Sequence, residues 1–143
     1  MKISTKGRYA LRLMIDLAKN YEGSYITLKE VSKRQEISIK YLEQITTQLC
    51  KADYLISVRG PKGGYKLSKE PKNYTAGDIL RVTEGSLAPI ACLENEKNSC
   101  QRCGFCSTLE FWKGLYKVIE DYVDSVTLED LIKNGDESLT YNI

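Results

Sequence analysis

The residues with the clearest chemical potential are four cysteines that lie in one short stretch of the chain. Cys92 is followed after seven residues by Cys100, and Cys103 and Cys106 follow at intervals of two residues each. Sulfur ligands on one loop can converge on a single centre, and four thiolates suit zinc or an iron–sulfur cluster. The spacing therefore predicts a metal site, with free thiols on a mobile loop as the alternative. Cys50 stands apart, and we expect it to be a small buried hydrophobe.

The composition of the chain excludes several classes of protein. Its 143 residues include no histidine and no apolar run that approaches the roughly 20 residues of a membrane span. It also lacks a signal peptide's apolar stretch, so we expect a cytoplasmic protein whose odd cysteine count serves metal or redox chemistry. The sequence has no glycine-rich nucleotide loop and no nucleophile with an evident base, so we do not expect an enzyme.

Two capped helices are predicted between residues 27 and 50. Thr27 and Glu30 have the form of a capping box, so a helix should begin at Leu28, and Ser38 is a second N-cap candidate. Two short helices joined by a tight turn are typical of a helix-turn-helix, although an ordinary helical hairpin has the same outline. The second helix has an apolar face of Ile39, Leu42, Ile45 and Leu49, and a polar face of Lys40, Tyr41, Glu43, Gln44, Thr47 and Gln48.

A glycine-rich hairpin is predicted directly after these helices. Residues 56–59 and 65–67 alternate apolar and polar side chains on either side of the turn GPKGG, which predicts a wing. Arg59 and Lys62 supply charge, and Arg59 is long enough to enter a minor groove. Gly63 and Gly64 have no side chain, so a backbone amide there could reach a phosphate. An electron carrier would use the same cysteines but would not need this wing.

The net charge of +2 hides an asymmetry between the two halves of the chain. Residues 1–74 hold 15 Lys or Arg against 7 Asp or Glu, and residues 75–143 hold 6 against 12, which gives +8 and −6. A basic half fits a polyanion partner, and the acidic half should face away from it. Lys2, Lys6, Arg8 and Arg12 crowd the start of the first helix, where a phosphate or solvent would relieve their repulsion.

Two more helices are predicted in the first part of the chain. The first is capped by Ser4 or Thr5 and should end at Gly23. The other begins after Thr75 and ends at Gly85. Residues 86–106 have no period and should form a long loop that carries the four cysteines. The apolar stripe of the first helix consists of Ala10, Leu13, Met14, Leu17 and Ala18.

The longest predicted helix follows the cysteine loop and is capped by Thr108. Because this helix lies beyond a compact winged module, we expect its apolar stripe to form a dimer interface rather than a core. A last short helix is capped by Thr127 and should end at Asn134 and Gly135, with a disordered tail beyond. The stripe of the long helix consists of Trp112, Leu115, Tyr116, Ile119, Tyr122, Val123 and Val126.

The predicted fold is therefore mainly α with a small β-hairpin. Residues 1–74 form a winged helix-turn-helix domain, and residues 75–106 form a short helix and the cysteine-rich loop. Residues 107–135 form the dimerisation helix and a short C-terminal helix, and residues 136–143 form a tail.

Four segments carry a resemblance to a known family, and together they span nearly the whole chain. They are MKISTKGRYA at residues 1–10, ISIKYLEQ at 37–44, SVRGPKGGY at 57–65 and AGDI at 76–79. The chain resembles the Rrf2-type winged-helix transcription regulators of bacteria, the IscR, NsrR and CymR group, and is most similar to the cluster-binding IscR type. The resemblance implies a homodimer that binds palindromic double-stranded promoter DNA, with the recognition helix in the major groove and the wing in the minor groove. The DNA-binding residues we expect are Ser38, Lys40, Tyr41, Glu43, Gln44, Arg59, Gly60, Lys62 and Gly63.

The resemblance also implies an iron–sulfur cluster on the cysteine loop, because Cys92, Cys100 and Cys106 match the cluster-binding members. In IscR-type members the fourth ligand is a histidine at the position of Leu109. In the nitric-oxide sensors it is an acidic residue near the N-terminus of the other subunit, a region where this chain has Arg8. The fourth ligand is therefore open between Cys103 as the local candidate, an oxygen ligand such as Glu43 or Glu110, and a small exogenous molecule.

We expect a 2Fe–2S rather than a 4Fe–4S cluster that senses iron, redox or nitric oxide status. Such a cluster would fix the angle between the dimerisation helices and the winged modules, and so the operator preference. The alternative is a zinc-held or thiol-based redox regulator, or a cysteine-metabolism repressor, on the same fold.

Overall fold

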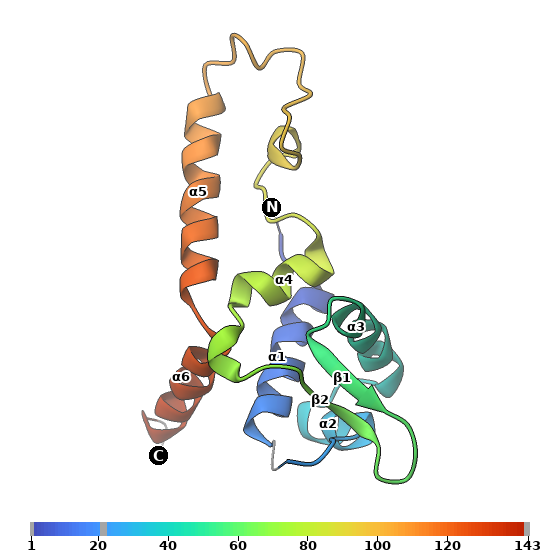
Figure 1. The fold of residues 1–143 in the computed structure, drawn as a ribbon. Coiled ribbons are helices and arrows are strands. Elements are labelled where there is room, and N and C mark those ends of the chain that lie inside the picture. The colour runs from blue at the N-terminus through green and yellow to red at the C-terminus, as the bar shows by residue number, and fades with distance from the viewer. Residues whose placement is uncertain (1, 21–22, 142–143) are drawn as a thin grey trace.

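The computed structural model describes residues 2–20 and 23–141, and it is mainly helical with one antiparallel hairpin, as predicted. The elements in chain order are α1 (Thr5–Lys19), α2 (Leu28–Gln35), α3 (Ile39–Lys51), β1 (Leu55–Val58), β2 (Gly64–Leu67), the 3₁₀ turn η1 (Pro71–Asn73), α4 (Ala76–Glu84), the 3₁₀ turn η2 (Ala91–Leu93), α5 (Leu109–Ser125) and α6 (Leu128–Tyr141). Helices α1 to α4 gather with the hairpin into one module, α5 rises from this module, and the loop between α4 and α5 arches above it (Figure 1).

Local capping interactions start most helices where the sequence predicts. The Thr27 N–H donates to Glu30 Oε2 at 2.8 Å, and the Glu30 N–H donates to Thr27 Oγ1 at 3.2 Å, which completes the capping box of α2. Ser38 Oγ accepts from the Tyr41 N–H at 3.1 Å and begins α3. The other predicted caps that form are Ser4, Thr75 and Thr127.

The hydrophobic core lies where α1 packs against α2, α3 and α4. The predicted stripe of α1 is buried except for Ala18, which is half-buried. The apolar face of α3 is buried except at Ile39, which is 43% exposed, so the prediction was wrong at this position. Ile39 is the first residue of α3 and projects past the edge of the core. The most deeply buried apolar side chains are Leu13, Met14, Leu17, Val31, Leu42, Ile45, Leu49, Tyr74, Ile79 and Leu128.

One buried carboxylate connects α1 to the end of α2. Asp16 is 2% exposed and accepts from Arg34 Nη2 at 2.8 Å and from Arg34 Nε at 3.0 Å. Gln35 Nε2 donates to the same carboxylate at 2.9 Å. Glu36 then takes the left-handed conformation, with φ 56°, and turns the chain towards α3. Asp16 therefore holds the turn between the two predicted helix-turn-helix elements.

Two predicted helix ends were wrong. Helix α1 ends at Lys19 rather than at Gly23, because the Asn20 N–H and Nδ2 both donate to Asp16 O, at 3.1 and 2.8 Å, and close the helix there. Helix α6 does not stop at Asn134 and Gly135 but continues to Tyr141, so residues 136–141 are helical rather than disordered. It packs against α1 and η1, contacts that no local pattern reveals. Residues 142 and 143 of the predicted tail lie outside the described residues.

The base of α5 is joined to the module by backbone and side-chain contacts. The Ala76 N–H donates to Val126 O at 2.8 Å, and the Leu128 N–H donates to Tyr74 O at 2.9 Å. Arg81 of α4 donates to both carboxylate oxygens of Asp124 at 2.7 and 3.0 Å. These contacts fix the direction in which α5 leaves the module.

Removing the Asp16 carboxylate should destabilise the fold. We expect Asp16→Ala to lower the free energy of unfolding by about 3 kcal/mol, the lower end of the range for a broken buried pair, because the Arg34 side chain keeps 37% exposure and can be rehydrated. Denaturant unfolding followed by circular dichroism measures the change. Lys72→Ala is the control, because Lys72 pairs with Glu70 in the open and should matter by less than about 0.5 kcal/mol. Equal effects of the two variants would contradict a central role for Asp16.

Candidate nucleic-acid interface and cysteine loop

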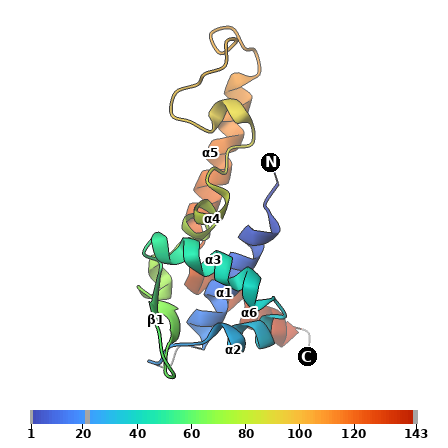
Figure 2. The ribbon, with the colours of Figure 1, turned by 90° about the vertical axis from the view of Figure 1, so that its right-hand side faces the viewer.

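The exposed side of α3 carries most of the predicted base readers. Lys40, Glu43 and Gln44 are exposed, and Ser38 caps the helix beside them. Tyr41 is less exposed than these residues: it is half-buried, and its ring packs edge-on against Tyr9 of α1, with ring centroids 5.5 Å apart. In Figure 2, α3 lies across the module and the hairpin hangs beside one end of it. The helix and the hairpin can therefore contact one extended partner together.

The hairpin forms the predicted wing, with the basic residues at its tip. Strands β1 and β2 pair from Leu55 opposite Leu67 to Val58 opposite Gly64. Arg59, Gly60 and Lys62 are exposed in the turn between them. The two-stranded hairpin therefore presents two cationic side chains at its exposed tip.

The two wing glycines have an internal role in the fold. A Cβ on Gly63 would lie 2.1 Å from Val58 O, and a Cβ on Gly64 would lie 2.4 Å from Ile26 O. The Gly63 N–H already donates to Gly60 O at 2.9 Å, so a phosphate would have to compete for it. The next residue, Tyr65, exchanges backbone hydrogen bonds of 2.7 and 2.9 Å with Ile26 and so joins the wing to the segment before α2.

The basic residues at the start of α1 differ in how freely they can meet an anion. Lys2 and Arg8 are exposed, and Lys6 is half-buried. Arg12 donates through Nε to Gln35 Oε1 at 3.2 Å, and its Nη2 donates to the Gln35 carbonyl. Arg12 therefore supports the turn of the helix-turn-helix from within the chain.

The four loop cysteines are free thiols that do not converge in this conformation. Cys100 is exposed, and Cys92, Cys103 and Cys106 are half-buried. Across residues 2–20 and 23–141, no three Cys, Asp or Glu side chains come close enough together to hold a metal ion. The donor chemistry nevertheless fits a thiolate-held metal or cluster, because four thiols share one loop that has no regular structure beyond η2 and can rearrange.

Cys106 has the most favourable setting for a thiolate. Its Sγ lies 3.5 Å from Thr108 Oγ1. Hydrogen bonding to the Thr108 side chain, and then to its backbone, lowers the pKa of the Cys106 thiol. The predicted cap at Thr108 was wrong: Thr108 precedes α5, but its hydroxyl lies against Cys106 Sγ and makes no capping hydrogen bond. Cys50, by contrast, packs partly against the core, and burial raises the pKa of its thiol, as expected for a structural cysteine.

The oxygen ligands considered for the fourth position lie in different places. Glu110 is in the first turn of α5, close in the chain to Cys106, and pairs with Lys113 at 3.5 Å. Glu43 is on α3, which belongs to the compact module, whereas the cysteine loop arches above that module (Figure 1). Within one chain, only Glu110 of the two is near the loop.

Helix α5 has no buried residue, which is unusual for an amphipathic helix of 17 residues. Four large apolar side chains at spacings of four, three and four are exposed on it: Phe111 (64%), Leu115 (37%), Val118 (65%) and Tyr122 (60%). The predicted stripe contains Leu115 and Tyr122 but misses the other two. Its remaining members, such as Trp112 and Tyr116, are half-buried on an adjacent face. The exposed stripe is a large apolar surface without a partner in this chain.

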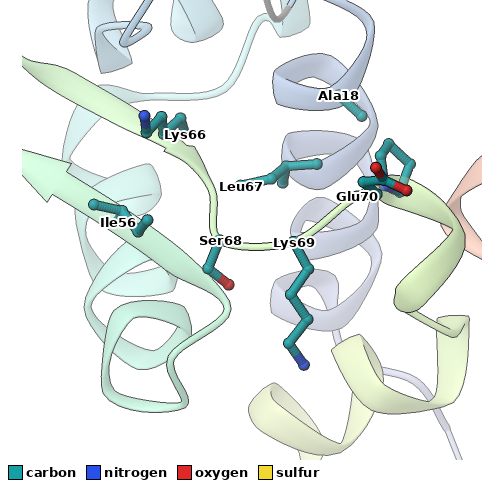
Figure 3. Close-up of a pocket in the computed structure, with 8 residues that line it drawn as sticks. Ala18, Ile56, Lys66, Leu67, Ser68, Lys69 and Glu70 are labelled. Atoms are coloured by element: carbon teal, nitrogen blue, oxygen red, sulfur yellow. The ribbon is translucent and has the colours of Figure 1, made fainter. Parts of the chain in front are cut away.

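A groove of about 510 Å³ lies behind the wing, away from the predicted site residues. Its apolar lining includes Ile56 and Leu67 (Figure 3). Figure 3 also shows that Lys66 and Lys69 extend in different directions, and their ammonium groups lie 4.7 Å from the Tyr25 ring and 5.3 Å from the Tyr54 ring. Because the ammonium groups of Lys66 and Lys69 do not point to a common centre, this groove is not a candidate ligand-binding site.

The family of the protein follows from comparison of the whole chain with known proteins. A model of the Rrf2 family, described as "Iron-dependent Transcriptional regulator", matches residues 3–134. The chain belongs to the Rrf2 family. It is 41% identical over 136 residues to the HTH-type transcriptional regulator CymR of Bacillus subtilis, across 95% of this chain and 93% of that one. It is 35% identical over 134 residues to IscR of Escherichia coli, and the alignment covers 94% of this chain and 82% of that one.

Solved structures of Rrf2 relatives have the same fold. The structure of B. subtilis CymR superposes with a TM-score of 0.76 at 41% identity and covers 94% of this chain and 98% of that one. The structure of T. potens IscR superposes with a TM-score of 0.75 at 37% identity, across 96% and 90%. The predicted resemblance is confirmed, and this Rrf2 protein is a DNA-binding transcription regulator and not an enzyme. Among its described helices, none is both long enough and apolar enough to cross a membrane.

The base-reading role predicted for α3 can be separated from simple charge attraction. Gln44→Ala should lower affinity for a selected operator by about tenfold or more, and leave binding to unrelated duplex nearly unchanged. Lys62→Ala on the wing tip is the contrast, because loss of a phosphate contact should weaken both kinds of DNA and reduce the salt slope by about one. Fluorescence anisotropy at several salt concentrations measures both. An equal loss on both DNAs for Gln44→Ala would show that Gln44 does not read bases.

Proposed function

We propose that this Rrf2 protein is a cytoplasmic homodimer that binds a palindromic operator and changes its operator binding with the state of its cysteine loop. The observation that carries the dimer is the exposed stripe of α5 (Phe111, Leu115, Val118 and Tyr122), which is too large and too regular for a solvated helix face. Packed against its symmetry mate, the stripe would be buried in an isologous interface.

The joint at the base of α5 would set the distance between the two recognition helices. Arg81 and Asp124 form a two-point contact, and hydrogen bonding between them raises the pKa of Arg81 and lowers that of Asp124, so both stay charged at neutral pH. Two α3 helices held this way would enter successive major grooves, about 34 Å apart, while the wings reach the flanking minor grooves.

The cysteine loop is the proposed sensor, with Cys92, Cys100 and Cys106 as ligands and Cys103 as the local fourth candidate. The soft donor set, the family description "Iron-dependent Transcriptional regulator" and the similarity to IscR support an iron–sulfur cluster, 2Fe–2S in preference to 4Fe–4S. When bound, such a cluster supplies a centre that responds to iron, redox or nitric oxide status.

Gathering the thiols would act on the protein through the two ends of the loop. Cys106 is three residues before the first residue of α5, and the Leu109 N–H donates to Cys106 O at 3.4 Å. At the other end, the loop begins at Gly85, directly after α4. Closing the loop around a metal would therefore pull on α4 and α5 together and change the angle between the winged module and the dimer.

The second candidate is a zinc-held or thiol-based regulator on the same fold. It is favoured by the 41% identity to CymR, whose solved structure is titled the global cysteine regulator of B. subtilis. A further solved relative, 37% identical, is titled an oxidized form of Staphylococcus aureus CymR. An S–S bond between Cys100 and Cys103 or Cys106 would then take the place of cluster loss. An oxidised low-molecular-weight disulfide would accept the two electrons and two protons by thiol–disulfide exchange and leave as two thiols.

Metal analysis of protein purified without oxygen tests the sensor. We expect iron with matching acid-labile sulfide and visible charge-transfer bands, and Cys106→Ala should lose both. Cys50→Ala is the matched control and should keep them, because Cys50 packs against the core. One zinc per chain without sulfide would disprove the iron–sulfur cluster and favour the zinc-held regulator. Absence of any metal would also disprove the cluster and would favour the thiol-based regulator.

A charge on the α5 stripe tests the dimer. Val118→Glu should convert the dimer to a monomer and weaken operator binding far more than non-specific binding, because a buried unpaired carboxylate is costly and the second half-site contact is lost. Lys117→Glu introduces the same residue on another side of α5, where the side chain is 75% exposed, and should leave the dimer intact. Sedimentation velocity measures the mass, and a dimeric Val118→Glu would disprove this interface.

A further inference from the structure

Ile39 places an exposed apolar side chain at the beginning of the predicted recognition helix. It is the first residue of α3, and 43% of its surface is exposed. Recognition helices contact base edges mainly through their N-terminal residues. Ile39 also lies one turn before Glu43, so the two side chains share a side of the helix. Sequence periodicity assigned Ile39 to the core, which is why it was not among the expected DNA contacts.

The surroundings of Ile39 distinguish it from an ordinary exposed apolar residue. Single exposed apolar side chains are common on proteins. Here, however, the neighbouring exposed residues Ser38, Lys40, Glu43 and Gln44 are polar and belong to the surface that the proposed function places on the bases. In that position Ile39 would be desolvated by DNA, and it has no hydrogen-bonding group to offer.

A major groove presents one apolar group, the C5-methyl of thymine. The other base-edge groups are hydrogen-bond donors or acceptors, which an isoleucine would leave unpaired at a cost. We propose that Ile39 is a specificity-determining residue that reads a thymine methyl group in each operator half-site. This inference rests on the proposed function, since it requires α3 to lie in the major groove.

The size of the effect follows from the area of one methyl group. Burying one methyl changes an equilibrium constant by about fourfold at 25 °C. Ile39 is peripheral to the core, and the Ser38 cap that begins α3 does not involve its side chain, so Ile39→Ala should leave the fold intact. Ile56 is the matched control, because it is an isoleucine of similar exposure, 40%, but lies on the wing strand β1.

The test removes the methyl group from the DNA as well as the side chain from the protein. An operator is first selected with the wild-type full-length protein from random duplexes, and each of its thymines is then replaced in turn by deoxyuridine. Fluorescence anisotropy at fixed salt should show one thymine in each half-site whose replacement weakens wild-type binding by about fourfold. Ile39→Ala should be insensitive to that replacement, whereas Ile56→Ala should keep the wild-type sensitivity.

Two results would overturn the inference, and they differ from failure of the proposed function. If no deoxyuridine position weakens wild-type binding, or if Ile39→Ala keeps the full sensitivity, Ile39 does not read a thymine methyl although an operator exists. If no sequence is enriched from the random duplexes, the proposed sequence-specific DNA binding itself fails.

Discussion

The hydrogen bonds to the buried carboxylate of Asp16 are the interaction on which the predicted DNA-binding surface depends. It lies on the central helix α1 and holds Arg34 and Gln35 at the end of α2. Because the next residue, Glu36, must adopt a left-handed conformation, the turn has little intrinsic preference for its shape and relies on this anchor. The direction of α3, and with it the position of the side chains predicted to contact bases, follows from a contact made behind the helix.

Helix α4 plays the corresponding role between the winged module and the rest of the chain. At its C-terminus, Glu84 accepts hydrogen bonds from the Ser4 N–H and hydroxyl at 3.0 and 2.6 Å, and so closes the start of α1. Near its N-terminus, Gly77 leaves room for Asp124 of α5, because a Cβ there would lie 2.2 Å from Asp124 Oδ1. The cysteine loop begins directly after Glu84. One short helix therefore contacts the rest of the module and α5, and it leads directly into the proposed sensor loop.

How much was predictable from sequence depended on the range of the interactions concerned. A capping box such as Thr27 with Glu30 is complete within four residues, so the helix starts were predicted correctly. The hairpin of the wing is likewise a local feature, and it was also predicted correctly. Helix α6 packs against α1 and η1, which are distant in the chain, and no local pattern indicates that the helix continues past Gly135. Ile39 is in phase with the buried apolar residues of α3 but is itself exposed, because periodicity along a helix does not show where the core ends. The exposed face of α5 was only half predicted, because a helix with apolar residues on two faces does not indicate which one a partner covers.

The length of α5 gives the joint at its base mechanical leverage. A helix of 17 residues extends about 25 Å, so a rotation of about 5° at the Arg81–Asp124 contact displaces its tip by about 2 Å. The converse also holds for a rigid helix: in the proposed mechanism, a displacement of a few ångströms where the cysteine loop meets α5 would rotate the winged module by a few degrees. In the proposed dimer, a rotation of each module would change the distance between the two recognition helices, whereas the spacing of the grooves on the duplex is fixed.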